Sequence, residues 1–168
     1  MMRSSQSLPI DDVLDDARRA LADKGVGVLV APPGAGKTTR VPLALLNEPW
    51  LQKNKILILE PRRIAARAAA ERMASTLGEK LAQTIGLRAR LSSQTATNVR
   101  IEVITEGVFT RMILDDPELT GVGAVLFDEF HERSLDADLG LAFARDSQQG
   151  LREDLKLLVM SATIDGAR

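Results

Sequence analysis

The sequence contains no cysteine and only one histidine among its 168 residues. The missing cysteines exclude disulfide bonds, thiol catalysis and zinc sites that are built on thiolates. A single histidine leaves no cluster of imidazoles for a transition metal. The lack of cysteine also fits a protein of the cytosol, so we expect a cytoplasmic location.

Long apolar segments are also missing. No apolar run approaches the roughly 18 residues of a membrane span, so we expect no membrane partner. The first residues, MMRSSQSLPI, have no apolar core and predict no export signal. Hydrophobic residues nevertheless make up 45% of the chain, which is typical of a folded globule. We expect a tail at residues 1–9 and one domain at residues 10–168.

The net charge of −1 conceals an uneven distribution along the chain. Residues 61–100 carry eight basic and two acidic groups, whereas residues 101–168 carry six basic and fourteen acidic groups. A basic block on a nearly neutral chain suits a phosphate-bearing partner that binds on one face. The alternative is a solvated helix with its loops, and the charge pattern alone does not decide between the two.

Short apolar runs alternate with helical patterns. Runs without polar alternation predict strands that are buried on both faces, at 26–31, 55–60, 123–128 and 155–160. Partial alternation predicts a further strand at 99–105 and a weaker one around 83–90, with a loop or hairpin end at 92–98. Helical spacing of apolar residues predicts helices at 10–23, 37–46, 62–77, 106–114 and 136–148. This order predicts an α/β fold, a mostly parallel central sheet with helices on both faces.

The first strand leads into APPGAGKTT, residues 31–39. This stretch follows the Walker pattern G-x-x-x-x-G-K-S/T, except that Ala31 occupies the position of the first glycine. Small residues let backbone N–H groups surround phosphate oxygens, and the next helix adds the positive end of its dipole. The alternative is an ordinary strand-to-helix turn. We expect a nucleotide, ATP, to be bound by Pro33, Gly34, Ala35, Gly36, Lys37, Thr38 and Thr39.

Two adjacent acids in LFDEFHERS, residues 126–134, follow the apolar run at 123–128. In such a fold the phosphate site lies beyond the carboxyl ends of the strands. We expect Asp128 and Thr38 to hold Mg²⁺, Lys37 to reach the β- and γ-phosphates, and Glu129 to polarise the attacking water. The alternative for adjacent acids is a solvated acidic turn.

Five segments in order resemble the motifs of the DEAH/RHA branch of superfamily 2 helicases, and within it the bacterial HrpB-type group. They are APPGAGKTTRVPLALL, EPRRIAARAAAERMA, VITEGVFTRMI, DEFHER and SAT. The resemblance extends from about residue 10 to the end, and it departs from the family at Ala31 and at Phe130, where the family has alanine. It implies a RecA-like P-loop NTPase domain that is the first lobe of a two-lobed enzyme. We expect the chain to be a fragment that lacks the second lobe.

The resemblance also implies roles for residues outside the phosphate loop. His131 would act beside Lys37 and Glu129 in catalysis and link the nucleotide site to the SAT segment. Ser161 and Thr163 of that segment would relay the nucleotide state. Arg72 would stack on the nucleotide base, which would permit other nucleoside triphosphates besides ATP.

The family likeness further implies a path for single-stranded nucleic acid, RNA in preference to DNA. Arg62, Arg63 and Thr105 match positions that line this path, and their chemistry suits phosphate and sugar contacts. With four Phe, one Trp and no Tyr, the chain has few aromatic platforms for stacking bases, which favours tracking of the backbone.

The resemblance implies an ATP-dependent helicase that hydrolyses nucleoside triphosphate with Mg²⁺ to move on or unwind nucleic acid. The arginine fingers expected on the second lobe are absent, so we expect nucleotide binding with very little turnover. The alternative is a nucleotide-gated module that holds RNA or a protein without unwinding. Intact Lys37, Asp128 and Glu129 favour turnover.

Overall fold

The computed structural model describes residues 9–32 and 36–162. Its strands are β1 (Val26–Val30), β2 (Lys55–Glu60), β3 (Ile85–Ala89), β4 (Ser92–Gln94), β5 (Ile101–Thr105), β6 (Val122–Phe127) and β7 (Lys156–Ser161). Its α-helices are α1 (Leu14–Lys24), α2 (Lys37–Leu45), α3 (Arg63–Thr76), α4 (Glu106–Asp115) and α5 (Leu135–Gly150). Two short 3-10 helices are η1 (Pro9–Asp12) and η2 (Phe130–Glu132).

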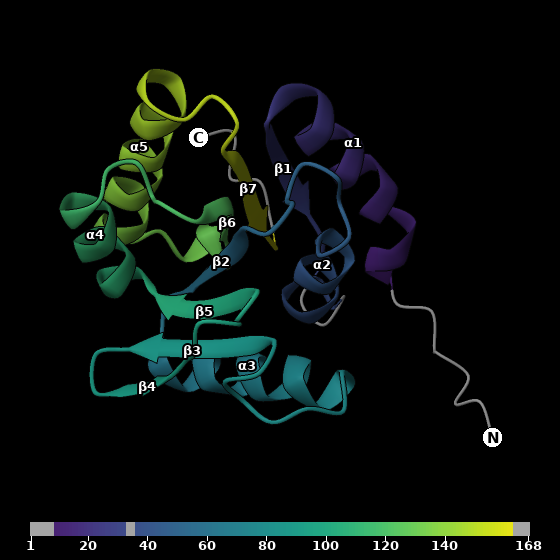
Figure 1. Cartoon of the computed structure of the whole chain (residues 1–168). Coiled ribbons are helices and arrows are strands. Elements are labelled where there is room, and N and C mark those ends of the chain that lie inside the picture. Colours follow the sequence, from purple (N-terminus) through teal and green to yellow (C-terminus); the bar gives the residue numbers. More distant parts are fainter. Residues whose placement is uncertain (1–8, 33–35, 163–168) are drawn as a thin grey trace.

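The strands form one seven-stranded sheet in the order β1-β7-β6-β2-β5-β3-β4 (Figure 1). All neighbouring strands pair in parallel except β3 and β4, which form an antiparallel hairpin. This confirms the mostly parallel sheet predicted from the sequence. The predicted strands and helices are all present within two residues of their expected ends, apart from the first helix, whose first turn is η1.

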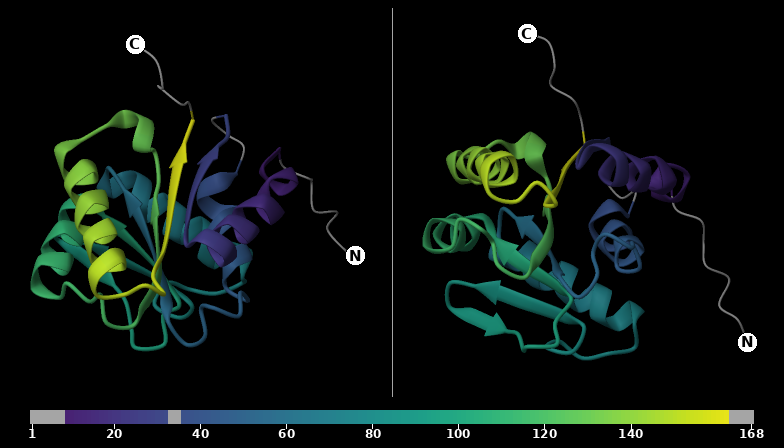
Figure 2. Two further views of the ribbon diagram at one scale, coloured as in Figure 1. Left: turned by 90° about the horizontal axis from the view of Figure 1, so that it is seen from above. Right: turned by 45° about the horizontal axis from the view of Figure 1, so that its top comes forward.

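Helices cover both faces of the sheet, α1, α2 and α3 on one side and α4 and α5 on the other (Figure 2). The central strand β2 shows why its sequence does not alternate. Ile56 and Ile58 are buried against the α1–α3 side, and Leu57 and Leu59 are buried against the α4–α5 side. Full burial of each such side chain stabilises the fold by roughly 1.5–3 kcal/mol.

The edge strand β1 departs from this pattern. The prediction of burial on both faces is wrong here, because Val28 is 68% exposed and Val30 is 39% exposed. Among the described strands, β1 pairs with β7 alone, and α1 covers one of its faces, where Leu29 is buried. Within the described part of the chain, the opposite face of β1 is left uncovered.

Gly25 ends α1 as predicted. Its φ of 72° lies in the left-handed region, which glycine adopts without steric cost, and its N–H donates to the carbonyl of Leu21. This turn sends the chain directly into β1, and β1 leads to the predicted phosphate loop. Among the described helices, none is long and apolar enough to cross a membrane.

Candidate functional site

The predicted phosphate loop joins β1 to α2 at the carboxyl end of the sheet. Pro33, Gly34 and Ala35 lie outside the described residues. Gly36 is the N-cap of α2 and has a φ of 93°, a conformation that favours glycine. Ala31 is buried, has no positive φ, and its N–H donates to the carbonyl of Ser161 at 3.1 Å. Ala31 therefore continues the pairing of β1 with β7, a role that does not require the glycine of the Walker pattern.

Lys37, the first residue of α2, is 4% exposed. Its Nζ lies 3.5 Å from Oε1 of Glu129, the acid that was predicted to polarise water. A buried ammonium group needs a partner, because desolvation of an unpaired charge is costly. The structure thus brings together the predicted phosphate-binding lysine and the predicted catalytic acid, which are far apart in the sequence.

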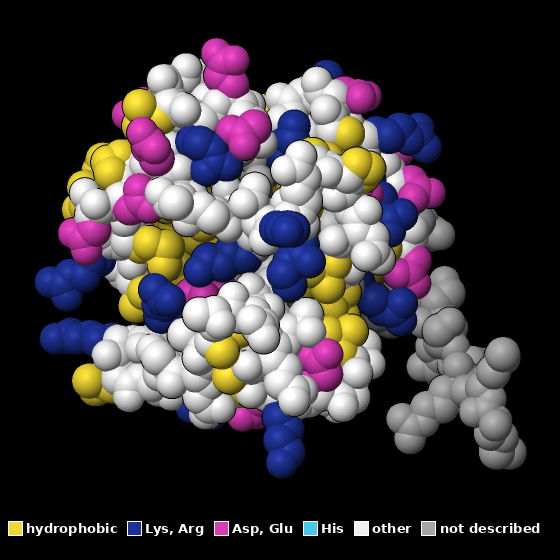
Figure 3. Space-filling model, viewed as in Figure 1, with side chains coloured by type: hydrophobic (Ala, Val, Ile, Leu, Met, Phe, Trp, Pro, Cys, Tyr) yellow, Lys and Arg dark blue, Asp and Glu magenta, His cyan; other side chains and the backbone are white. Residues whose placement is uncertain are grey.

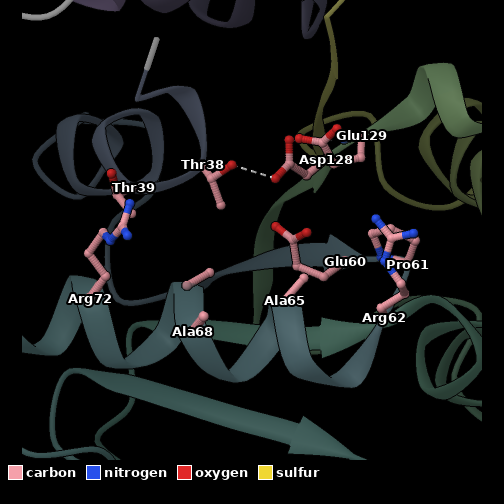
Figure 4. Close-up of a pocket in the computed structure, with 11 residues that line it drawn as sticks. Thr38, Thr39, Glu60, Pro61, Arg62, Ala65, Ala68, Arg72, Asp128 and Glu129 are labelled. Carbon is pink, nitrogen blue, oxygen red and sulfur yellow. Dashed lines mark hydrogen bonds between the residues drawn. The ribbon is translucent and has the colours of Figure 1, made fainter. Parts of the chain in front are cut away.

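Thr38 and Asp128, the two predicted Mg²⁺ ligands, are in direct contact (Figure 4). The hydroxyl Oγ1 of Thr38 donates to Oδ2 of Asp128 at 2.6 Å, and Oδ1 of Asp128 accepts the N–H of Glu129 at 2.9 Å. Asp128 follows β6 and is 2% exposed. Two adjacent oxygen donors, one of them a carboxylate, fit the ligand preference of Mg²⁺.

Glu129 has a left-handed backbone with φ 53° and ψ 35°, which is uncommon for a residue other than glycine. Its side chain is held from two sides. Lys37 contacts Oε1, and Nε2 of His131 lies 3.0 Å from Oε2. Strained backbone that is fixed by several contacts is typical of functional sites.

His131 joins this acid to the end of β7. Its Nδ1 accepts the N–H of Ala162 at 3.0 Å, so Nε2 must carry the proton of the neutral ring and donate to Glu129. Ala162 belongs to the SAT segment, to which His131 was predicted to connect. Ser161 is buried at the end of β7, while Thr163 lies outside the described residues.

Glu60 is a site residue that the sequence analysis missed. It ends β2, is 2% exposed, and points toward Asp128 (Figure 4). Burial, together with a hydrogen bond to Asp128 and the neighbouring acids, raises the pKa of Glu60 to about 11. Glu60 is therefore neutral at pH 7. The available signal was an acid at the end of KILILE, an otherwise apolar strand that enters the core.

A pocket of about 400 Å³ opens beside these groups, lined by Thr39 of α2 and by one side of α3. Along α3 the wall consists of Ala65, Ala68 and Ala69, whose small side chains leave room for a flat ligand. Arg72 lies at one end of this wall and Arg62 near the other (Figure 4). The volume falls in the range of small-molecule sites, roughly 300–1,000 Å³.

The predicted RNA-contacting residues follow two neighbouring strands. Arg62 and Arg63 follow Pro61 after the end of β2 and are exposed. Thr105 ends β5, where it pairs in register with Glu60. Nη2 of Arg62 donates to Oε1 of Glu132 in η2 at 2.9 Å. These residues therefore lie at the same edge of the sheet as the pocket beside α3.

Arg88 and Arg100, which also belong to the 61–100 block, have other partners. Arg88 contacts the buried carboxylate of Glu102 at 2.9 Å, and Arg100 donates to the carbonyls of Gln52 and Asn54, which precede β2. Figure 3 shows Lys and Arg side chains gathered near the centre of one face, with single ones at the rim. Because Arg62 and Arg100 lie at opposite ends of β2, the basic block does not form one continuous surface.

Comparison with known proteins agrees with this geometry. Residues 5–168 match the family model described as DEAD/DEAH box helicase. The chain is 56% identical over 162 residues to the ATP-dependent RNA helicase HrpB of Escherichia coli K12, across 96% of this chain and 20% of that protein. It is 31% identical over 170 residues to the probable ATP-dependent RNA helicase DHR2 of Saccharomyces cerevisiae, across 100% of this chain and 23% of that protein.

The fold is similar to a solved helicase structure as well. The crystal structure of the Escherichia coli DEAH/RHA helicase HrpB superposes with a TM-score of 0.91 and 56% identity, over 95% of this chain and 20% of that one. The chain thus spans about a fifth of the length of the relatives it matches. The match of nearly the whole sequence to the family model, together with the shared fold, confirms the resemblance: the chain belongs to the DEAD/DEAH box helicase family.

Proposed function

We propose that residues 10–168 form the first, nucleotide-binding RecA-like lobe of an ATP-dependent RNA helicase. The observation that carries this proposal is the direct contact of Thr38 with Asp128 beside the pairing of Lys37 with Glu129. The groups proposed to bind phosphate, to hold the metal and to activate water then lie together at one edge of the sheet. The relatives that are named RNA helicases support the choice of nucleic acid.

Hydrolysis would use these groups in separate roles. Thr38 and Asp128 would hold Mg²⁺, which when bound neutralises charge on the phosphates. Lys37 would leave Glu129 for the β- and γ-phosphates, and Oε1 of Glu129 would then be available to accept a hydrogen bond from the attacking water. His131 would keep Glu129 in place, because its donation occupies the other carboxylate oxygen, Oε2.

The nucleotide base would lie along the alanine wall of α3 and stack on Arg72. A guanidinium group that stacks on the base contacts the flat face of the base ring and not the edge groups that distinguish one base from another. Weak selectivity among nucleoside triphosphates follows. The pocket next to α3 supports this assignment, because Ala65 and Ala68 leave the space that a base requires.

Single-stranded RNA would pass Arg62, Arg63 and Thr105, which would contact its phosphates and sugars without reading sequence. A second RecA-like lobe of the longer protein would complete the site and supply arginine fingers. The lack of cysteine supports a cytoplasmic setting for this enzyme.

The test uses a chain that extends to the length of the family relatives. With ATP and Mg²⁺ it should separate an RNA duplex that carries a single-stranded tail. Glu129→Gln should abolish strand separation and leave ATP binding intact, because only the activation of water is lost. Lys53→Gln, an exposed change in the turn before β2, serves as the control. Strand separation that persists in Glu129→Gln would contradict the assignment.

A further inference from the structure

Residues 132–134 end the turn that begins at the proposed catalytic acid, Glu129, which we call the catalytic turn. They contact both segments of the proposed RNA path, the one after β2 and the one after β5. Glu132, the last residue of η2, accepts from Arg62 at 2.9 Å. Ser134 donates from Oγ to Oε2 of Glu106 at 2.6 Å, and Glu106 directly follows Thr105. The nucleotide site and the RNA path are therefore joined through side chains of residues 132–134.

The position of η2 itself is fixed by aromatic packing. The ring of Phe130 meets that of Phe127 edge-on, with centroids 6.5 Å apart, and Phe127 meets Phe109 of α4 edge-on at 5.9 Å. Phe130 replaces the alanine of the DEAH pattern, so this contact is one that the usual residue would not make. Glu129 and Arg133, on either side of η2, both have positive φ, which restricts the turn further. Glu132 is thus presented from a constrained turn.

Arg62 is held more weakly. Its side chain is 68% exposed, and that of Glu132 is 35% exposed. Ion pairs between such exposed groups contribute about 0–1 kcal/mol and are screened by salt. A phosphate group offers Arg62 the same kind of charged oxygen acceptor, with geometry suited to its planar donors. Exchange of Glu132 for a phosphate would therefore cost little.

We propose that Glu132 is a positioning residue that holds Arg62 and competes with the RNA backbone for it. This inference rests on the proposed function, because it assumes that Arg62 contacts RNA. Glu132 shares its turn with Glu129, so a rearrangement of that turn on nucleotide binding changes the competition for Arg62. By linkage, RNA and nucleotide then affect each other's affinity by the same factor.

The experiment is a double-mutant cycle on the chain, with fluorescence anisotropy of a labelled single-stranded oligouridine at low salt. Glu132→Gln should tighten RNA binding about two- to fivefold, the effect expected for an exposed ion pair. Arg62→Ala should weaken binding, and Glu132→Gln added to Arg62→Ala should produce no further gain. Glu71→Gln is the control, because it removes the same charge from an exposed pair with Arg67 on α3.

The outcomes separate the two proposals. If Glu132→Gln raises RNA affinity equally with and without Arg62, the effect is one of general charge, and the competition is overturned. The competition is also overturned if Glu132→Gln leaves RNA affinity unchanged while Arg62→Ala weakens it. Unchanged binding in Arg62→Ala would overturn the RNA path itself, and no binding by any variant would overturn both proposals. In a second measurement, the ratio of RNA affinities with and without Mg·ADP should move toward one in Glu132→Gln; an unaltered ratio would contradict the link to the catalytic turn.

Discussion

The proposed nucleotide pocket and the proposed RNA path lie at the same edge of the sheet, yet they are built differently. At the proposed nucleotide site, Lys37, Asp128 and Glu60 are each at most 4% exposed. Lys37 pairs with Glu129, and Glu60 shares a hydrogen bond with Asp128. On the RNA path, Arg62 is 68% exposed and makes an ion pair that water and salt can reach. Buried groups are costly to change, whereas exposed groups exchange partners easily. The difference suits a site that fixes one small ligand and a path along which a strand must move.

The largest effect expected is on turnover. The second lobe that we propose would carry the arginine fingers, and loss of such a group lowers the rate by ~10³–10⁵. Phosphate release by this chain should therefore be slower than that of the longer protein by a factor in this range. Equal rates, measured at saturating ATP, would show that the first lobe needs no partner for chemistry.

A second expectation concerns Glu60 and pH. The folded pKa of Glu60, about 11, lies above its ordinary value of 4.5, so folding binds a proton between these values. The stabilisation of the fold by protonated Glu60 is fully present below pH 4.5 and is lost as the pH rises toward 11. Glu60→Gln has no carboxyl group to titrate, so it does not suffer this loss. Its free energy of unfolding should rise relative to that of the wild type by up to about 1.4 kcal/mol per pH unit.

Urea denaturation at pH 5, 7 and 9 measures this gain. Glu132→Gln is the matched control, because it makes the same substitution at an exposed glutamate. Its free energy of unfolding should differ from that of the wild type by less than about 1 kcal/mol at each pH. A Glu60→Gln protein that follows the wild-type pH dependence would mean that Glu60 is ionised in the folded state.

The sequence predicted much of this fold because buried strands and phosphate loops have strong local signals. Apolar runs that do not alternate located β2 and β6, and the Walker pattern located α2 and Lys37. Features that depend on which strands are neighbours were not accessible. The exposure of Val28 follows from the edge position of β1, and the neutral state of Glu60 follows from the placement of β2 beside β6.

Contacts between distant segments were equally hidden. Arg62 and Glu132 are 70 residues apart, and their pairing requires the strand order as well as the strained turn at Glu129. The role of Phe130 became visible only with the rings of Phe127 and Phe109 in place. Local motifs thus predicted which residues gather at the candidate site, and the sheet topology determined how they are held.

The smallest effect is expected at the sheet edge. Val28 is 68% exposed, so Val28→Thr should change the free energy of unfolding by less than about 0.5 kcal/mol. Val125→Thr, on the fully buried strand β6, is the matched control and should destabilise by more than about 1 kcal/mol, since it buries a hydroxyl group. Similar losses in both variants, measured by urea denaturation, would mean that the outer face of β1 is covered.

The central claim is that the loop at residues 31–39 and the acids after β6 form a nucleotide site despite Ala31. Calorimetric titration of this chain with Mg·ADP tests it most directly, with Lys37→Ala as the variant and Lys53→Ala, an exposed lysine, as the control. We expect saturable one-site binding by the wild type and by Lys53→Ala, and loss of binding in Lys37→Ala. Absence of binding by the folded wild-type chain, or equal binding by Lys37→Ala, would contradict it.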